Sequence, residues 1–238
     1  MTVLPKVVIA ASFVVLAGCT TGVNLEPAPA ANEAAVAQEA VVARVNGVQM
    51  TVQVDTWPGD PGVTEDVTPV QVSIENNSGA PLRVAYSAFA LISPSGIRYS
   101  AIPPYNIEGA VDQVELAGAY APIADPLFTY SNFYAAPIYE PIYSGIGIYN
   151  DPYYYDLGYY NAYYDYWGET ALPTAAMLAR ALPEGVVMSG GSVTGFLYFE
   201  KVDPDEVDRV RFRADLRNPD SGKVFGEIRI PLILEGED

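Results

Sequence analysis

The sequence predicts a mainly β protein: an antiparallel β-sandwich of about seven strands, with one long tyrosine-rich insertion and one or two short helices. Alternating apolar and polar residues, the pattern of half-buried strands, occur in two blocks of the 238-residue chain, near 44–102 and 190–234. Turn-forming clusters of Gly, Pro, Asn and Ser separate these runs, as in a sandwich. Between the blocks the composition changes, and 13 of the 18 tyrosines fall between Tyr130 and Tyr166.

The first block begins near Arg44 and contains four strand patterns. Apolar residues alternate with polar ones over 48–55 and again over 70–75, which predicts two half-buried strands. The turn cluster NNSGAP follows, and 82–92 is apolar on both faces, which predicts a single central strand. A second turn, SPSG, leads into 97–102. Pro103-Pro104 should end the pairing because proline donates no ladder hydrogen bond.

The second block contains three more strand patterns. The segment 190–202 enters through glycines, and 207–217 alternates apolar residues with Arg and Asp. The turn NPDSGK connects the latter to 224–234, the last predicted strand. Pro231 in that strand predicts an edge position or a bulge, since a central strand cannot lose the donor.

The change of composition predicts that residues 118–169 are an insertion in one connection of the sandwich. Loops of that length are usually functional or disordered. At the helical step of about 100° per residue, the aromatic residues of 155–167 fall on half of the wheel. These residues are Tyr155, Tyr159, Tyr160, Tyr163, Tyr164, Tyr166 and Trp167. The segment therefore predicts an amphipathic helix of about three turns, and 172–182 predicts a second short helix.

Three interpretations of this aromatic face follow from the residues. It packs on the sandwich as an extra core layer, because tyrosine combines an apolar body with a polar tip. It forms a recognition surface for a protein or glycan of the cell envelope, since Tyr and Trp provide large contact areas at low entropic cost. Or the segment is a disordered stretch of low complexity. The sequence leaves these alternatives open.

The beginning of the chain has the pattern of a secretory signal. Lys6 precedes an apolar run, Val7–Ala17, that is too short to span a bilayer. The run ends in Leu16-Ala17-Gly18-Cys19, which resembles the lipobox of bacterial lipoproteins. The resemblance implies cleavage before Cys19 and lipid attachment to its sulfur and its new amino group. Cys19 is the single cysteine of the chain, so no intramolecular disulfide is possible.

A second resemblance concerns the two strand blocks. V-x-V-x-I-x-N-N-S-G at 70–79, F-A-L-x-x-x-x-G-x-x-Y at 89–99 and T-G-F-L-Y-F at 194–199 are similar to small Ig-like domains on exported bacterial proteins. That resemblance implies a non-catalytic adhesion or interaction scaffold. The predicted division of the chain is a signal peptide over 1–18, a lipidated flexible tether over 19–43, one sandwich domain formed by 44–117 and 170–236, and the insertion over 118–169.

Charge restricts the partners. The chain has 12 basic and 29 acidic residues, a formal net charge of −17, and no histidine. This balance argues against nucleic acid and against docking on anionic lipid, because phosphates attract Lys and Arg. The expected location is the cell envelope, anchored by lipid to the outer membrane on its periplasmic side. Thr20 supports this, since lipoproteins retained in the inner membrane commonly carry aspartate after the cysteine.

No catalytic constellation is evident, so we expect no enzyme activity and no cofactor. Nucleophilic catalysis lacks its usual residues, because the chain has no histidine and a single cysteine, which the lipobox resemblance implies is lipidated. The alternative is a hydrolase of envelope polymers, glycan or peptidoglycan, that works through paired carboxylates. The only metal candidate is a weak calcium site at Asp203, Asp205 and Asp208 in one short turn.

Overall fold

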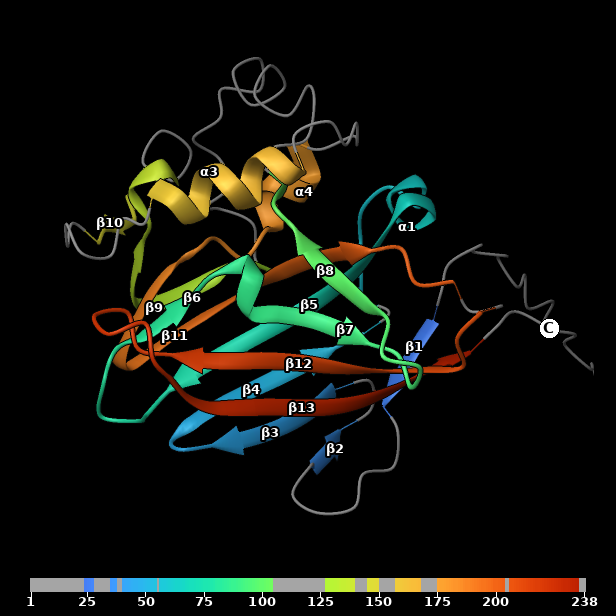
Figure 1. Ribbon diagram of the computed structural model, residues 1–238, viewed down its shortest axis with the longest axis horizontal. Helices are drawn as coiled ribbons and strands as arrows, with labels where there is room; N and C mark the ends of the chain where they lie inside the picture. Colours follow the sequence, from blue (N-terminus) through green and yellow to red (C-terminus); the bar gives the residue numbers. More distant parts are fainter. Residues whose placement is uncertain are drawn as a thin grey trace, which may run out of the picture.

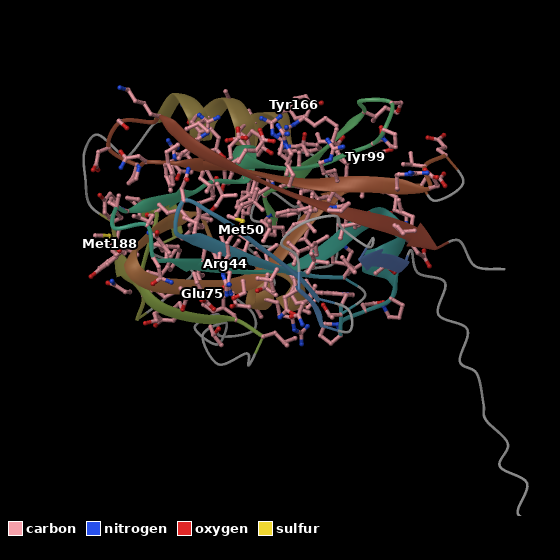
Figure 2. The ribbon with its side chains drawn as sticks, turned by 90° about the horizontal axis from the view of Figure 1, so that it is seen from below. Arg44, Met50, Glu75, Tyr99, Tyr166 and Met188 are labelled. Atoms are coloured by element: carbon pink, nitrogen blue, oxygen red, sulfur yellow. The ribbon has the colours of Figure 1, made fainter. Side chains whose placement is uncertain are left out.

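The computed structural model describes residues 24–27, 35–37, 40–54, 56–104, 127–139, 145–149, 157–167, 175–203 and 206–235. Within these ranges the strands join one continuous sheet in the order β1-β13-β12-β7-β8-β11-β5-β4-β3-β2, with β6, β9 and β10 pairing off this path. The sheet folds over on itself into two layers (Figures 1 and 2). The prediction of a mainly β, antiparallel sandwich is confirmed.

The elements of the N-terminal half are β1 Asn24–Pro27, β2 Ala35–Ala37, β3 Ala40–Val45, β4 Val48–Gln53, α1 Gly62–Asp66, β5 Val67–Asn76, β6 Leu82–Val84, the 3₁₀ helix η1 Tyr86–Ala88, β7 Phe89–Ile92 and β8 Arg98–Ile102. The elements of the C-terminal half are β9 Thr129–Ala135, the 3₁₀ helix η4 Pro137–Tyr139, β10 Gly147–Ile148, α3 Leu157–Tyr166, α4 Ala175–Arg180, β11 Gly185–Glu200, β12 Arg209–Arg217 and β13 Val224–Glu235.

One layer consists of β13, β12, β7 and β8, and the other of β11, β5, β4 and β3. Strand β11 connects them: Gly191–Glu200 pairs along β5, and Tyr198 and Phe199 also pair with β8. Figure 2 shows Met50 between the layers, whereas Arg44 and Glu75 lie on the outer side of the β3–β5 layer. Helix α3 lies beyond one end of the sandwich, above β6 and β9 in Figure 1.

The core between the layers comes from the inward residues of the alternating strands. Every second residue of β4, β5, β12 and, from Ile228 onward, β13 is buried, as the period of two predicts. Fully buried examples are Val48, Val52, Val72, Ile74, Phe212, Ala214 and Ile228. Asn46 and Gly47 join β3 to β4 with φ of 50° and 82°, the positive values that a two-residue hairpin turn requires. The Asn46 amide also donates to the Phe225 carbonyl at 2.6 Å, which links the layers.

Strand pairing begins earlier than the sequence predicts. Within 19–43, the predicted tether, β1 pairs with β13 and β2 pairs with β3. Strand β3 starts at Ala40 rather than near Arg44, and Val41 is fully buried. The apolar, β-branched run Val41-Val42 favours this strand. With β1, β2 and β3, the two insertion strands β9 and β10, and the division of 82–92 into β6 and β7, the described strands number thirteen, compared with the seven or so expected.

The segment 82–92 is not one central strand, as the sequence predicts, but two strands separated by η1. Strand β6 pairs with β11 and, at Arg83, with β12, whereas β7 pairs with β12 and β8, so the chain leaves β11 between these two strands. The physical reason lies at Tyr86, whose backbone N–H donates to the Glu184 carboxylate at 2.7 Å rather than to a strand.

The predicted insertion and the last strands also differ in their bounds. Within 118–169, β9 is part of the sheet and pairs with β11. Strand β11 begins at Gly185 rather than 190, because Val186 and Val187 are buried between β6 and β9. The two predicted helices are present as α3 and α4. Strand β13 lies at a sheet edge over 224–231, as Pro231 predicts, since β1 joins it only from Leu232.

Candidate functional site

The aromatic face of α3 is turned toward the protein itself. Tyr160 and Tyr164 are buried. Tyr159, Tyr163 and Trp167 are half-buried. Tyr166 is 76% exposed and lies at the surface in Figure 2. Tyr155 lies outside the described residues. Most of the described members of the predicted recognition surface therefore contact the protein's own interior. This agrees with the interpretation in which the aromatic face packs on the sandwich as an extra core layer.

These tyrosines surround a residue that the sequence analysis did not single out. Glu184 lies between α4 and β11, and its exposed fraction is 0%. Oε1 accepts hydrogen bonds from the Tyr86 backbone N–H at 2.7 Å and from the Tyr159 hydroxyl at 2.5 Å. Oε2 accepts from the hydroxyls of Tyr164 at 2.7 Å and Tyr139 at 3.0 Å. We call Glu184 with Tyr86, Tyr139, Tyr159 and Tyr164 the Glu184 cluster.

The cluster joins parts of the chain that are far apart in sequence. Tyr86 belongs to η1, Tyr139 to η4, and Tyr159 and Tyr164 to α3. The Tyr86 hydroxyl donates to the Leu182 carbonyl at 2.9 Å, which fixes the segment that carries Glu184. One carboxyl group thus connects the segment between α4 and β11 with the tyrosine-rich region and with the β6–β7 connection.

Further contacts hold α3 to the sheet around the cluster. The Tyr163 hydroxyl donates to the Ala101 carbonyl of β8 at 2.6 Å. The Arg83 guanidinium of β6 lies 5.3 Å from the centroid of the Tyr159 ring, within the range of a cation–π contact. The rings of Tyr159 and Tyr163, four residues apart on the helix, stack at 5.5 Å. Helix α3 is therefore attached through both rings and hydroxyls.

Burial sets the electrostatics of the cluster. It raises the pKa of Glu184, and the four hydrogen bonds oppose that rise because they favour the carboxylate. Burial beside Glu184 also raises the pKa of Tyr159 and of Tyr164 well above that of a free phenol. Each of the three groups therefore keeps its proton to a higher pH in the folded protein than it would in water.

The carboxyl group of the Glu184 cluster is closed off from solvent and connects the surrounding elements. A general acid or base must lie within hydrogen-bonding reach of a substrate atom, but Glu184 has no exposed surface. Its sequence setting, ALPEGVVM, offered the one available signal: a single acid between apolar residues at the start of a strand. A buried acid must be hydrogen-bonded or paired, yet nothing local identified the tyrosines that would bind it.

The remaining predicted site residues are dispersed. Cys19 and Asp205 lie outside the described residues. Asp208 is exposed and forms an ion pair with Arg209 at 2.8 Å, while the Asp203 carbonyl accepts the Val207 N–H within the turn. In the described part of the chain no group of three or more acidic residues is placed to hold a metal ion. Nor is any described helix long and apolar enough to cross a membrane.

Two surface hollows are present in the described part. One, of about 680 Å³, lies at the end of β12 and β13 and contains a single carboxylate, that of Asp208. The other, of about 450 Å³, lies over the β3–β4 hairpin and contains the single carboxylate of Glu75. Comparison with known proteins finds no matching family, no similar curated protein and no similar solved structure.

Proposed function

We propose that this chain is a lipid-anchored protein of the bacterial cell envelope, in which the β-sandwich has a non-catalytic structural or binding role. The observation that carries the proposal is the lipobox Leu16-Ala17-Gly18-Cys19 at the end of a short apolar run. The first described strand, β1, starts at Asn24, only five residues after Cys19. The Ig-like resemblance and the outer-membrane location remain predictions.

The Glu184 cluster supports assigning α3 to the fold. The hydroxyls of Tyr159 and Tyr164 are engaged by Glu184, so an aromatic recognition surface would require α3 to leave the sandwich. The hydrolase alternative has less support. Paired-carboxylate hydrolysis requires two carboxyl groups about 5–10 Å apart around the substrate, and each hollow described above has one.

The anchoring is tested by expressing the full chain in a Gram-negative host with radioactive palmitate. The unmodified protein should be labelled and should fractionate with the outer membrane. Cys19→Ala should lose both the label and the membrane association. Membrane association of Cys19→Ala equal to that of the unmodified chain would refute the anchor. Thr20→Asp is the matched variant for location, and it should keep the label but move the protein to the inner membrane.

A further inference from the structure

The basic residues of this acidic chain are concentrated on one surface. Six of the 12 Lys and Arg residues fall between Arg209 and Arg229, although the chain has a net charge of −17. Five of these six are arginines of β12 and β13, and Figure 1 shows these two strands side by side at the front of the molecule.

The strand register places these arginines on one face. Residues 210, 212, 214 and 216 of β12 are buried, so the odd-numbered residues of this strand point outward. Arg213 pairs with Arg229, and Asp215 pairs with Glu227 on the neighbouring strand. We call the outward set the arginine face. Its members are Arg209, Arg211, Arg213, Arg217 and Arg229, with the acids Asp208, Asp215 and Glu227.

Two of the three acids of the arginine face, Asp215 and Glu227, are less exposed than the guanidinium groups, whereas Asp208 is 71% exposed and pairs with Arg209. Arg213 bridges Asp215 at 3.0 Å and Glu227 at 3.3 Å, and Arg217 bridges Asp215 at 3.1 Å. The side chains of Asp215 and Glu227 are 15% and 24% exposed, whereas those of Arg213, Arg217 and Arg229 are 37–63% exposed. The face therefore presents mainly guanidinium groups outward, which bind phosphate oxygens through paired N–H donors.

The larger hollow lies at one end of the arginine face. Its lining includes Arg209 and Arg211 together with apolar side chains of Ile92, Pro94, Pro231 and Ile233. Guanidinium groups beside an apolar floor suit an anionic, amphiphilic surface. The outer side of the opposite layer differs, because its residues are mostly Gln, Thr and Ser, with Arg44 and Glu75 among them (Figure 2).

The same end of the face lies next to β1, the first described strand. Strand β1 pairs with Leu232–Glu235 of β13, beside the hollow (Figure 1). Asn24 is five residues after Cys19, and five residues span at most about 18 Å. If Cys19 carries the lipid, the headgroup layer lies within that distance of Asn24, whose strand β1 borders the end of the arginine face that contains Arg209.

We propose that the arginine face lies on the anionic phosphate headgroups of the membrane in which Cys19 is anchored, and so orients the domain. This inference rests on the proposed function. Net charge alone predicted no docking on anionic lipid, but the charges are separated: the arginine face is attracted to the membrane while the acidic remainder is repelled from it.

The test uses lipidated full-length protein reconstituted into vesicles of phosphatidylcholine, with or without 30% phosphatidylglycerol. Ser221→Cys supplies a dye site in the exposed β12–β13 hairpin, at the opposite end of the strands from β1. Energy transfer from this dye to headgroup-labelled lipid then reports whether the whole arginine face lies against the membrane. Glu75→Cys, on the opposite layer, is the matched dye site.

Phosphatidylglycerol should raise transfer from position 221 but not from position 75, and 0.5 M salt should reverse the rise because surface charges are then screened. The triple change Arg209→Gln, Arg211→Gln, Arg229→Gln should reduce the docking equilibrium constant on the order of 100-fold, since each arginine near an anionic surface contributes roughly fivefold. Arg44→Gln, which removes one exposed arginine from the opposite layer, should have no effect.

The outcomes separate the two proposals. Flotation with pure phosphatidylcholine vesicles tests the lipid anchor, and loss of flotation would overturn the proposed function. Normal flotation, together with energy transfer that does not change with phosphatidylglycerol or salt, would overturn only the proposed orientation by the arginine face. The lipid anchor would then stand. The lipid and salt comparisons use all five arginines, so they stand even if the triple variant fails to fold.

Discussion

Two buried regions of this domain are stabilised in different ways. Between the layers, the contacts are aliphatic and aromatic, and residues such as Ile74 and Phe212 are fully buried. Beneath α3, an acid is fully buried among tyrosines, and hydrogen bonds determine the geometry. Apolar burial is non-directional and tolerates exchange of similar side chains. A buried polar cluster requires every donor and acceptor to find its partner.

The comparison teaches where specificity resides in this fold. The sandwich core can form with any well-packed apolar set, but the position of α3 depends on a single carboxylate that receives four hydrogen bonds. Loss of one core methyl group therefore weakens the core locally, whereas loss of Glu184 leaves donors from three other elements unsatisfied.

Glu184→Ala is expected to have the largest effect. It leaves four donors without their acceptor, three of them buried and that of Tyr159 half-buried, and at about 1 kcal/mol for each donor the free energy of unfolding should fall by about 4 kcal/mol. Denaturant unfolding monitored by circular dichroism measures this change. Glu75→Ala, which removes an exposed acid from β5, is the matched control and should change stability by less than about 0.5 kcal/mol. Equal effects of the two substitutions would contradict the role of the Glu184 cluster.

Ile74→Ala tests the apolar region. Ile74 is fully buried on β5, and its truncation should cost about 3 kcal/mol through lost transfer energy and the cavity that remains. Amide hydrogen exchange should sharpen the comparison, because α3 should keep its native protection in Ile74→Ala and lose it in Glu184→Ala. Loss of α3 protection in both variants would show that the two regions are one cooperative unit.

The sequence predicts these regions unequally. Alternation over 48–55 and 70–75 identified the inward side chains, because a strand of period two needs only local information. The helical period of 155–167 predicted α3 and its aromatic face, but whether that face turns inward depends on residues elsewhere. The partners of Glu184 lie 20, 25, 45 and 98 positions away. No local pattern links them, and Tyr86 was assigned to the interior of a strand.

Tyr164→Phe should have a smaller effect than either truncation. It removes one hydroxyl from Glu184 and should cost about 2 kcal/mol, the value for a buried hydrogen bond to an acid. The matched control is Tyr198→Phe, whose buried hydroxyl donates to the neutral Met177 carbonyl at 2.9 Å, with an expected cost of about 1 kcal/mol. Chemical unfolding at pH 7 compares them. A greater cost for Tyr198→Phe would show that the bond to Glu184 has no special strength.

The pH dependence of stability is the most gradual test, with a slope of at most about 1.4 kcal/mol per pH unit for one proton. Burial raises the pKa of Glu184 in the folded state, so the unfolded chain releases this proton first as the pH rises. The stabilisation from protonated Glu184 is thus complete below about pH 4.3, the value of an unperturbed glutamate, and it is lost as the pH rises through the folded-state pKa. Glu184→Gln lacks this titration but keeps the other acids, so it is the matched control. The free energy of unfolding of the unmodified protein minus that of Glu184→Gln should fall between pH 4 and pH 8. A difference that rises over this range would mean that the four hydrogen bonds outweigh burial, and that Glu184 is held as a carboxylate.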